Sequence, residues 1–357
     1  MTAREDTQKP FAASPFNDSK ADLILRSSDG VYFCVYKLLL SLVSPVFATM
    51  FELPTDGMQE MYDNRICIGV DDNNETLSRV LPWCDPRCIS AIQSPKDVEI
   101  ILRVSDKYDM EPIKKRCVRA LECSPGIFTP ENSFEIYALA IQYQISHLAC
   151  LAAKMTLHLE LEKRPYFPAL KSIPASALYH LDFYHITCGK VAQKVIEDEF
   201  SVPNNLFGQG SGTVGCCGVE GVARGNLGWK FWAVQHMDRI SEKLRKTPVS
   251  TVVVDPKLLV ETQGRTSSCS ACRGNTSHAD LQRFNQSLMD KVEQAISKRK
   301  GSYVVRARIV LIHHGFPALR SHRTNADLAS TKCNANMYHS LKLAPSDFLT
   351  TKRGKLD

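Results

Sequence analysis

Two cysteines late in the chain, Cys269 and Cys272, have the spacing of a metal-binding pair. Thiolates separated by two residues can bind one tetrahedral zinc ion, and His278 and the pair Cys216-Cys217 could supply further ligands. A structural zinc site needs four ligands, and the second pair stands at no familiar spacing from the first. Cys269 and Cys272 are therefore metal candidates only, and we predict no bound metal or other cofactor.

Motifs of the common enzyme families are absent from the sequence. There is no Gly-x-Ser-x-Gly, no Gly-x-x-x-x-Gly-Lys-Ser/Thr, no His-Glu-x-x-His and no dinucleotide-binding fingerprint. The 13 Cys and 10 His residues can be combined into a nucleophile and a base in many ways, so no such pair carries information. We predict no enzymatic activity, no catalytic residue and no small-molecule substrate.

Basic residues gather at the end of the sequence. From Lys298 onward, 12 Lys or Arg stand against 3 Asp or Glu, whereas the preceding residues hold 32 against 35. The run Lys298-Arg-Lys300, with Arg306 and Arg308, could serve as a nuclear-targeting or nucleic-acid-binding patch. A nucleic-acid-binding domain normally carries its basic face on the folded part, and no zinc-finger spacing occurs. We therefore favour a solvated tail and predict no nucleic-acid partner.

Membrane and export signals are also missing. No segment reaches the roughly 18 uninterrupted apolar residues of a membrane helix, and the first 18 residues have no apolar core of a secretory signal. We expect a protein that has no membrane partner and stays inside the cell, in the cytoplasm or the nucleus. Its cysteines are then mostly reduced, and Cys34, Cys117 and Cys150 are interpreted as small hydrophobic residues.

Composition and periodicity divide the 357 residues into six parts. We expect a disordered N-terminus (1–18), a first domain (19–124), a helical extension (125–200), a glycine-rich linker (201–228), a C-terminal helical segment (229–297) and a basic, disordered tail (298–357).

The first domain begins with a predicted hairpin. Two apolar runs flank Asp29-Gly30, a pair that favours a tight turn between antiparallel strands. The apolar spacing then becomes helical over residues 38–51, and Ser44-Pro45 fits the cap and first position of a second short helix. The sequence therefore predicts two strands followed by two short helices.

A third strand and several helices follow. We predict a strand over residues 65–70, a helix over 75–83 and a helix opened by Ser94-Pro-Lys-Asp97, which combines an N-cap, a proline and an acid at the third position. A further helix over residues 113–121 precedes the expected end of the domain near Ser124. Beyond it, helical stripes are predicted over 137–159, 175–199, 229–244 and 281–296, the last ending at Ser297.

This order of elements resembles the BTB/POZ (Skp1-like) fold. The family pattern apolar-x-apolar-His-Lys, Leu, Ser-Pro-x-Phe-x-x-Met-Phe is matched by residues 33–51, with Tyr36 in place of the histidine, and Asp22 matches the aspartate at the first strand. Residues 24–30 and 107–111 are similar to the basidiomycete fungal branch, which carries a helical extension. The resemblance implies an α+β domain with a short sheet and helices, followed by a mainly α-helical region.

The resemblance implies a protein-interaction scaffold that pairs with itself or with another BTB protein. The implied interaction candidates are Asp22, Tyr36, Lys37, Leu38, Leu39, Leu42, Pro45 and Phe47. For Leu39, Leu42 and Phe47, core packing is the favoured interpretation, because apolar residues at helical spacing are usually interior. One alternative is a substrate adaptor with a cullin as partner. Adaptors of the family often offer an apolar-x-Glu pattern to the cullin in the loop after the central helix, and residues 87–95 here contain no glutamate. The third option is a transcription-linked regulator.

Overall fold

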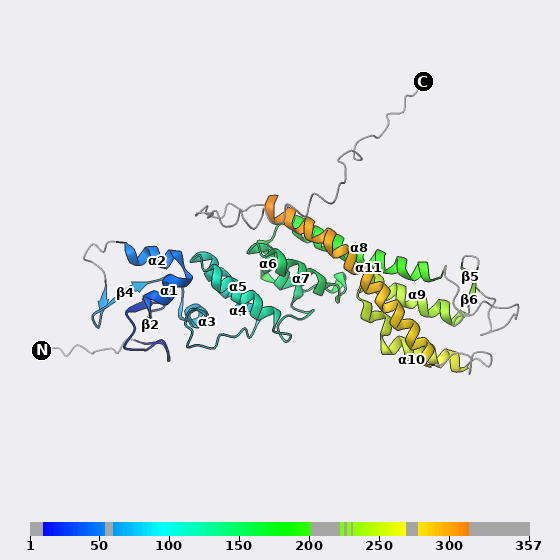
Figure 1. Cartoon of the computed structure of the whole chain (residues 1–357), viewed down its shortest axis with the longest axis horizontal. Helices are drawn as coiled ribbons and strands as arrows, with labels where there is room; N and C mark the ends of the chain where they lie inside the picture. Colours follow the sequence, from blue (N-terminus) through cyan, green and yellow to red (C-terminus); the bar gives the residue numbers. More distant parts are fainter. Residues whose placement is uncertain are drawn as a thin grey trace, which may run out of the picture. The chain divides into compact units, whose positions relative to one another are not determined.

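The computed structural model describes residues 10–53, 60–200, 222–224, 227–229, 231–268 and 278–313 (Figure 1). A four-stranded sheet with five helices precedes a region built mainly of helices, which confirms the predicted fold class. Within the described residues, no helix is long and apolar enough to cross a membrane.

The sheet has the strand order β2-β1-β4-β3. Its strands are β1 (Leu23–Arg26), β2 (Tyr32–Val35), β3 (Met61–Tyr62) and β4 (Arg65–Gly69). The predicted hairpin is confirmed: β1 and β2 are antiparallel with Leu23 opposite Val35, and Gly30 in the turn has φ +86°, which glycine adopts without strain. Strand β4 pairs with β1 in parallel.

Both faces of the sheet are covered, because alternate side chains of each strand point to opposite sides. Leu23, Leu25 and Phe33 are fully buried in the main core together with residues of the helices. Ile24 and Cys34 lie on the other face, in a second and smaller cluster. That cluster also contains Ala21, Tyr32 and Cys67, with Phe11, Tyr36 and Tyr62 packed against it.

Residues 10–18 are part of this domain. The backbone N–H of Ala12 donates to the carbonyl of Tyr32 at 2.8 Å, and the N–H of Tyr32 donates to the carbonyl of Pro10 at 2.9 Å. Phe16 is buried and its ring lies 6.0 Å from that of Phe33. The prediction that residues 1–18 are disordered is therefore wrong for 10–18, because Phe16 packs in the main core and Phe11 packs against the smaller cluster. Residues 1–9 lie outside the described residues.

Five helices complete the first domain: α1 (Lys37–Val43), α2 (Pro45–Glu52), α3 (Asn74–Cys84), α4 (Pro95–Lys107) and α5 (Glu111–Glu122). The predicted caps are confirmed. The Ser44 hydroxyl accepts from the N–H of Phe47 at the start of α2, and Ser94 and Asp97 form a reciprocal capping box at α4. Asn73 adds a cap at α3 by accepting from Thr76.

The predicted stripe over residues 137–159 is divided into two helices. These are α6 (Ser133–Gln142) and α7 (Ser146–Thr156), and Gln144 between them has φ +57° in the left-handed region. Two short 3-10 helices, η1 (Leu161–Lys163) and η2 (Pro168–Ser172), lead to α8 (Ala175–Glu199), which has the predicted bounds. The expected boundary at residue 124 falls between α5 and α6.

The remaining described elements are β5 (Val222–Arg224), β6 (Leu227–Trp229), α9 (Phe231–Lys246), η4 (Ser250–Val254), α10 (Pro256–Ser268) and α11 (His278–His313). Strands β5 and β6 form an antiparallel pair at the end of the expected glycine-rich linker. The last helix continues to His313, so its predicted end at Ser297 is wrong. The prediction that the chain is disordered from residue 298 onward is likewise wrong for residues 298–313. Residues 314–357 lie outside the described residues.

The cysteine interpretation is confirmed for Cys34, Cys117 and Cys150, which are buried thiols. Burial raises the pKa of the Cys117 thiol to about 12, so it stays protonated. Cys269, Cys272 and Cys216-Cys217 lie outside the described residues. In the described part of the chain, no group of His, Cys, Asp or Glu is arranged to hold a metal ion.

Candidate protein-interaction surface

Helix α1 is attached to the sheet by side chains of the segment that leads into the first strand. The carboxylate of Asp22 accepts a hydrogen bond at 2.9 Å from the backbone N–H of Lys37, the first residue of α1. The hydroxyl of Tyr36, one residue earlier, donates to the carboxylate of Asp18 at 2.8 Å. Asp22 therefore positions the helix, because it satisfies a backbone N–H that has no partner within α1.

Large apolar side chains are exposed along α1 and α2. Leu38 and Leu42 are 67% and 68% exposed, and their spacing of four residues places them on one face of α1. Val46 in α2 and Leu53 directly after it are 37% and 60% exposed. We call these four residues the α1–α2 apolar surface. Exposed apolar residues that are neighbours, as Leu38 and Leu42 are on α1, are typical of a protein-binding site, whereas single ones are common on any protein.

The other predicted interaction residues lie in different environments. Pro45 is exposed at the start of α2, while Leu39 and Lys37 are half-buried. Phe47 is 2% exposed and its ring stacks on that of Tyr108 at 4.7 Å. The core interpretation is thus confirmed for Phe47 and wrong for Leu42, because Leu40 is the α1 residue that is buried in the core.

Val46, Leu53 and Met61 are exposed and are not among the predicted interaction residues. Leu53 follows Val46 by seven residues, a helical spacing that could have identified it. Met61, 56% exposed on the edge strand β3, carries no sequence signal because that strand has only two residues.

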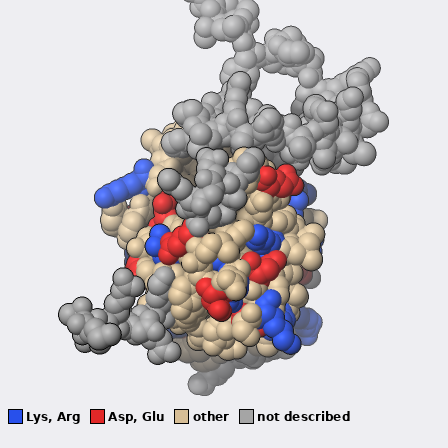
Figure 2. All heavy atoms as spheres, turned by 90° about the vertical axis from the view of Figure 1, so that its left-hand side faces the viewer, with Lys and Arg blue, Asp and Glu red and all other residues tan. Residues whose placement is uncertain are grey.

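Charged side chains of both signs lie on the face of the molecule that Figure 2 shows. Figure 2 views the side that carries the sheet, and Lys, Arg, Asp and Glu are interspersed there with uncharged residues. This distribution differs from the one-signed basic face typical of nucleic-acid binding.

A polar network lies beside Tyr36, the residue that replaces the family's histidine. Arg87 donates to Asp18 at 2.9 Å and to Asp85 at 2.7 Å, and its guanidinium lies 5.1 Å from the centre of the Tyr36 ring. Hydrogen bonds from the Lys20 N–H, the Tyr36 hydroxyl and Arg87 lower the pKa of Asp18 to about 2. The network joins the N-terminal segment to the loop after α3.

That loop exposes one isoleucine almost completely. Ile89 is 98% exposed, whereas Ile92, three residues later, is buried in the main core. Ala91, which is exposed, stands two residues after Ile89, where the apolar-x-Glu pattern would place a glutamate. An isoleucine this exposed gains little from folding and is free to contact a partner.

Comparison with known protein families gives a match for the first domain. A BTB/POZ domain model matches residues 14–125, which include the sheet, helices α1 to α5 and the α1–α2 apolar surface. No curated protein matches the chain.

Proposed function

Residues 14–125 form a BTB/POZ domain, a protein-interaction module, and we propose that the chain is a scaffold that associates through this domain with a second copy or with another BTB protein. The observation that carries the proposal is the exposure of Leu38 and Leu42, which are 67% and 68% exposed on one face of α1. Neither residue is needed by the core of its own chain.

Burial of the α1–α2 apolar surface would favour association. Complete burial of one leucine side chain contributes roughly 1.5–3 kcal/mol relative to exposure. In a symmetric dimer each residue is buried twice, once from each chain. A stable interface usually buries about 800 Å² per partner, so we expect residues around these four, such as the exposed Pro45, to contribute as well.

Solution mass tests the proposal. We would measure light scattering of the full-length chain over a dilution series, together with the double variant Leu38→Asp/Leu42→Asp. The wild type should show twice the monomer mass at high concentration, and the variant should stay monomeric because association would bury four carboxylates, two from each chain. The matched control is Ile89→Asp, which places a carboxylate on the exposed loop and should leave the mass unchanged.

Circular dichroism spectra must agree among the three proteins, so that a lower mass reports association and not unfolding. A wild type that remains monomeric at every concentration contradicts self-association. If it gains mass only when mixed with another BTB protein, the partner is a different chain.

A cullin adaptor is the second candidate, supported by the 98% exposure of Ile89 in the loop after α3. The full-length chain would be mixed with a purified cullin N-terminal domain. A mass step that disappears in Ile89→Asp but persists in Leu38→Asp/Leu42→Asp supports this role, whereas no mass step rejects it. A transcription-linked role has no comparable observation, because the side chains after Lys298 lie outside the described residues.

A further inference from the structure

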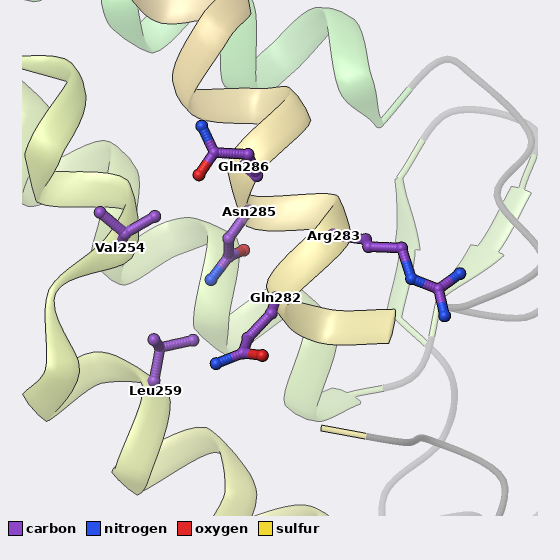
Figure 3. Close-up of a pocket in the computed structure, with 6 residues that line it drawn as sticks. All are labelled: Val254, Leu259, Gln282, Arg283, Asn285 and Gln286. Atoms are coloured by element: carbon purple, nitrogen blue, oxygen red, sulfur yellow. The ribbon is translucent and has the colours of Figure 1, made fainter. Parts of the chain in front are cut away.

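A pocket of about 370 Å³ lies where η4 and α10 face α11 (Figure 3). Its lining consists of Val254, Leu259, Gln282, Arg283, Asn285 and Gln286. The amide of Asn285 is out of reach of a ligand, because Asn285 is 0% exposed and its Oδ1 lies 3.2 Å from Nε2 of the buried His236. The remaining lining mixes aliphatic, amide and guanidinium groups, so the pocket selects no class of ligand.

Helix α8 exposes a row of large apolar side chains outside this pocket. Tyr179, Phe183 and Ile186 are 65%, 41% and 48% exposed. Their spacings of four and three residues place them in one line along the helix, and the rings of Tyr179 and Phe183 stack at 6.3 Å. The buried residues of α8, such as Leu181 and Cys188, lie on the opposite side of the helix. The exposed row therefore adds little to the core of its own chain.

The same face of α8 continues into two lysines. Lys190 and Lys194 follow Ile186 at two successive spacings of four residues, and both are exposed. Neither lysine has an ion-pair partner within the described part of the chain. Glu197 is the next exposed residue on this face and ends the basic stretch. We give the name α8 stripe to Tyr179, Phe183, Ile186, Lys190 and Lys194, which span about 22 Å at 1.5 Å per residue.

We propose that the α8 stripe binds an amphipathic, acidic helix of a partner protein. The apolar residues of that helix lie on the three exposed apolar side chains, and its carboxylates face the two lysines. The spacings of four, three and four residues from Tyr179 to Lys190 are those at which two helices pack side by side. An antiparallel partner carries its acids in its first turns, where the helix dipole favours negative charge. This surface lies outside residues 14–125 and does not depend on association through them.

An acidic helix fits the α8 stripe better than other partners do. The backbone groups in the middle of a helix are paired within it, so an extended peptide finds no main-chain partner there. A second copy of α8 in parallel would bring the lysines of both chains together. In an antiparallel pair with Phe183 across from Ile186 of the second copy, Lys190 would face Tyr179 and meet no carboxylate. Only a partner with its own acidic residues neutralises both lysines.

The probe is the peptide EQAAEAQLAAQLAQLAQA, amidated at its C-terminus and labelled with fluorescein at its N-terminus. Its glutamates and leucines recur at alternating spacings of four and three residues, and its alanines favour a helix. Titration with the full-length chain, followed by fluorescence anisotropy, should show saturable binding with a Kd on the order of 100 μM. A peptide with lysine in place of both glutamates should bind about tenfold more weakly, because its charges repel those of Lys190 and Lys194. A peptide with alanine in place of the leucines should also bind about tenfold more weakly.

Variants of the chain identify the surface that binds the peptide. Ile186→Ser should weaken binding of the glutamate peptide about tenfold, because one apolar contact is lost. The matched control is Val260→Ser, at a valine of α10 that is 66% exposed, and it should leave the Kd unchanged. The double variant Lys190→Glu/Lys194→Glu should bind the lysine peptide more tightly than the glutamate peptide. Unfolding cannot produce such a reversal of preference.

Several results overturn the proposal. These are anisotropy that does not saturate with the glutamate peptide, an equal Kd for the glutamate and lysine peptides, and an equal Kd in Ile186→Ser and Val260→Ser. If the peptide does not bind but Ile186→Ser lowers the solution mass below that of the wild type, the α8 stripe pairs with a second copy and the proposal fails. Because the readout is binding of the peptide, it does not depend on association through the α1–α2 apolar surface.

Discussion

The Ser44 hydroxyl donates a hydrogen bond to the main-chain carbonyl of Tyr108 at 2.5 Å and accepts one from the N–H of Phe47 at 3.1 Å. One buried side chain thus caps α2 and links it to the end of α4, 64 residues later. The rings of Phe47 and Tyr108 stack directly beside this link. The position of α2, which carries Val46 and is followed by Leu53, therefore depends on Ser44.

Substitution Ser44→Ala should destabilise α2. Loss of the cap costs about 1 kcal/mol, and a buried carbonyl that loses its partner adds about 1–3 kcal/mol. Amide hydrogen exchange of the full-length chain, resolved by mass spectrometry, should be at least fivefold faster in peptides from α2. The control Ser78→Ala, at an exposed site of α3, should leave these rates unchanged, and equal rates in both variants would contradict the assigned role.

Close packing of α8 and α9 at Gly189 gives a second prediction. A Cβ at this position would lie 2.9 Å from the carbonyl oxygen of Arg245, so the two helices would have to separate. We expect Gly189→Ala to lower the free energy of unfolding by about 1–3 kcal/mol despite the higher helix propensity of alanine. The thermal midpoint of the full-length chain should fall accordingly.

The matched control is Gly264→Ala in α10, where an added Cβ meets nothing within 4 Å. There alanine should raise stability by about 0.5–1 kcal/mol, because glycine is the poorer helix former. If both substitutions change the midpoint in the same direction, the contact between Gly189 and Arg245 does not limit the packing of α8 and α9.

Acid should weaken the domain through Asp72. Burial of this carboxylate raises its pKa, but hydrogen bonds from Lys107 and Tyr108 and the charge of Arg103 outweigh burial and hold the pKa below the ordinary value of 3.8. A depressed pKa means that the stabilisation is complete above pH 3.8 and is lost as the pH falls further, through the pKa of the folded state.

The comparison variant is Asp72→Asn, which cannot ionise. Its thermal midpoint should lie roughly 3–10 °C below that of the wild type at pH 6, since hydrogen bonds to a charged group are lost. The difference should shrink steadily below pH 3.8. A difference that is constant from pH 6 to pH 2.5 would show that the charge of Asp72 does not contribute.

Tyr36 should control the ionisation of Asp18. The substitution Tyr36→Phe removes the donor at 2.8 Å, and we expect the pKa of Asp18 to rise from about 2 while staying below 3.8, because the Lys20 N–H and Arg87 still donate. A carboxyl ¹³C NMR titration of labelled aspartate measures this pKa. Tyr179→Phe, at an exposed position of α8, is the control, and a pKa that is unchanged in both variants would refute the role of Tyr36.

Local signals were sufficient for most of the first domain. The Asp29-Gly30 turn, the Ser44-Pro45 cap and the Ser94 capping box each act within a few residues, so the sequence predicts them directly. Which apolar residues of α1 enter the core depends on tertiary packing. Leu42 and Phe47 both belong to the apolar residues that recur at helical spacing over residues 38–51, yet Leu42 is exposed and Phe47 is buried.

The helical region contains features without a local signal. Gln144 breaks the predicted stripe in the left-handed conformation, although neither glycine nor proline marks the place. Helix α10 was not predicted because its buried face includes Thr262 and Thr266 among few apolar residues. The contact of His236 with Asn285 joins residues 49 positions apart, so only the folded chain reveals the pocket beside them.

The parallel pairing of β1 with β4 bears on the order of events during synthesis. Strand β1 lies between β2 and β4, so its second edge is filled only when residues 65–69 have emerged from the ribosome. Helices α1 and α2 belong to the segment that bridges these two strands, and closing so long a loop is slow compared with forming a hairpin. Leu38 and Leu42 therefore leave the ribosome before the domain that supports them is complete, a period in which chaperones can shield them from neighbouring nascent chains.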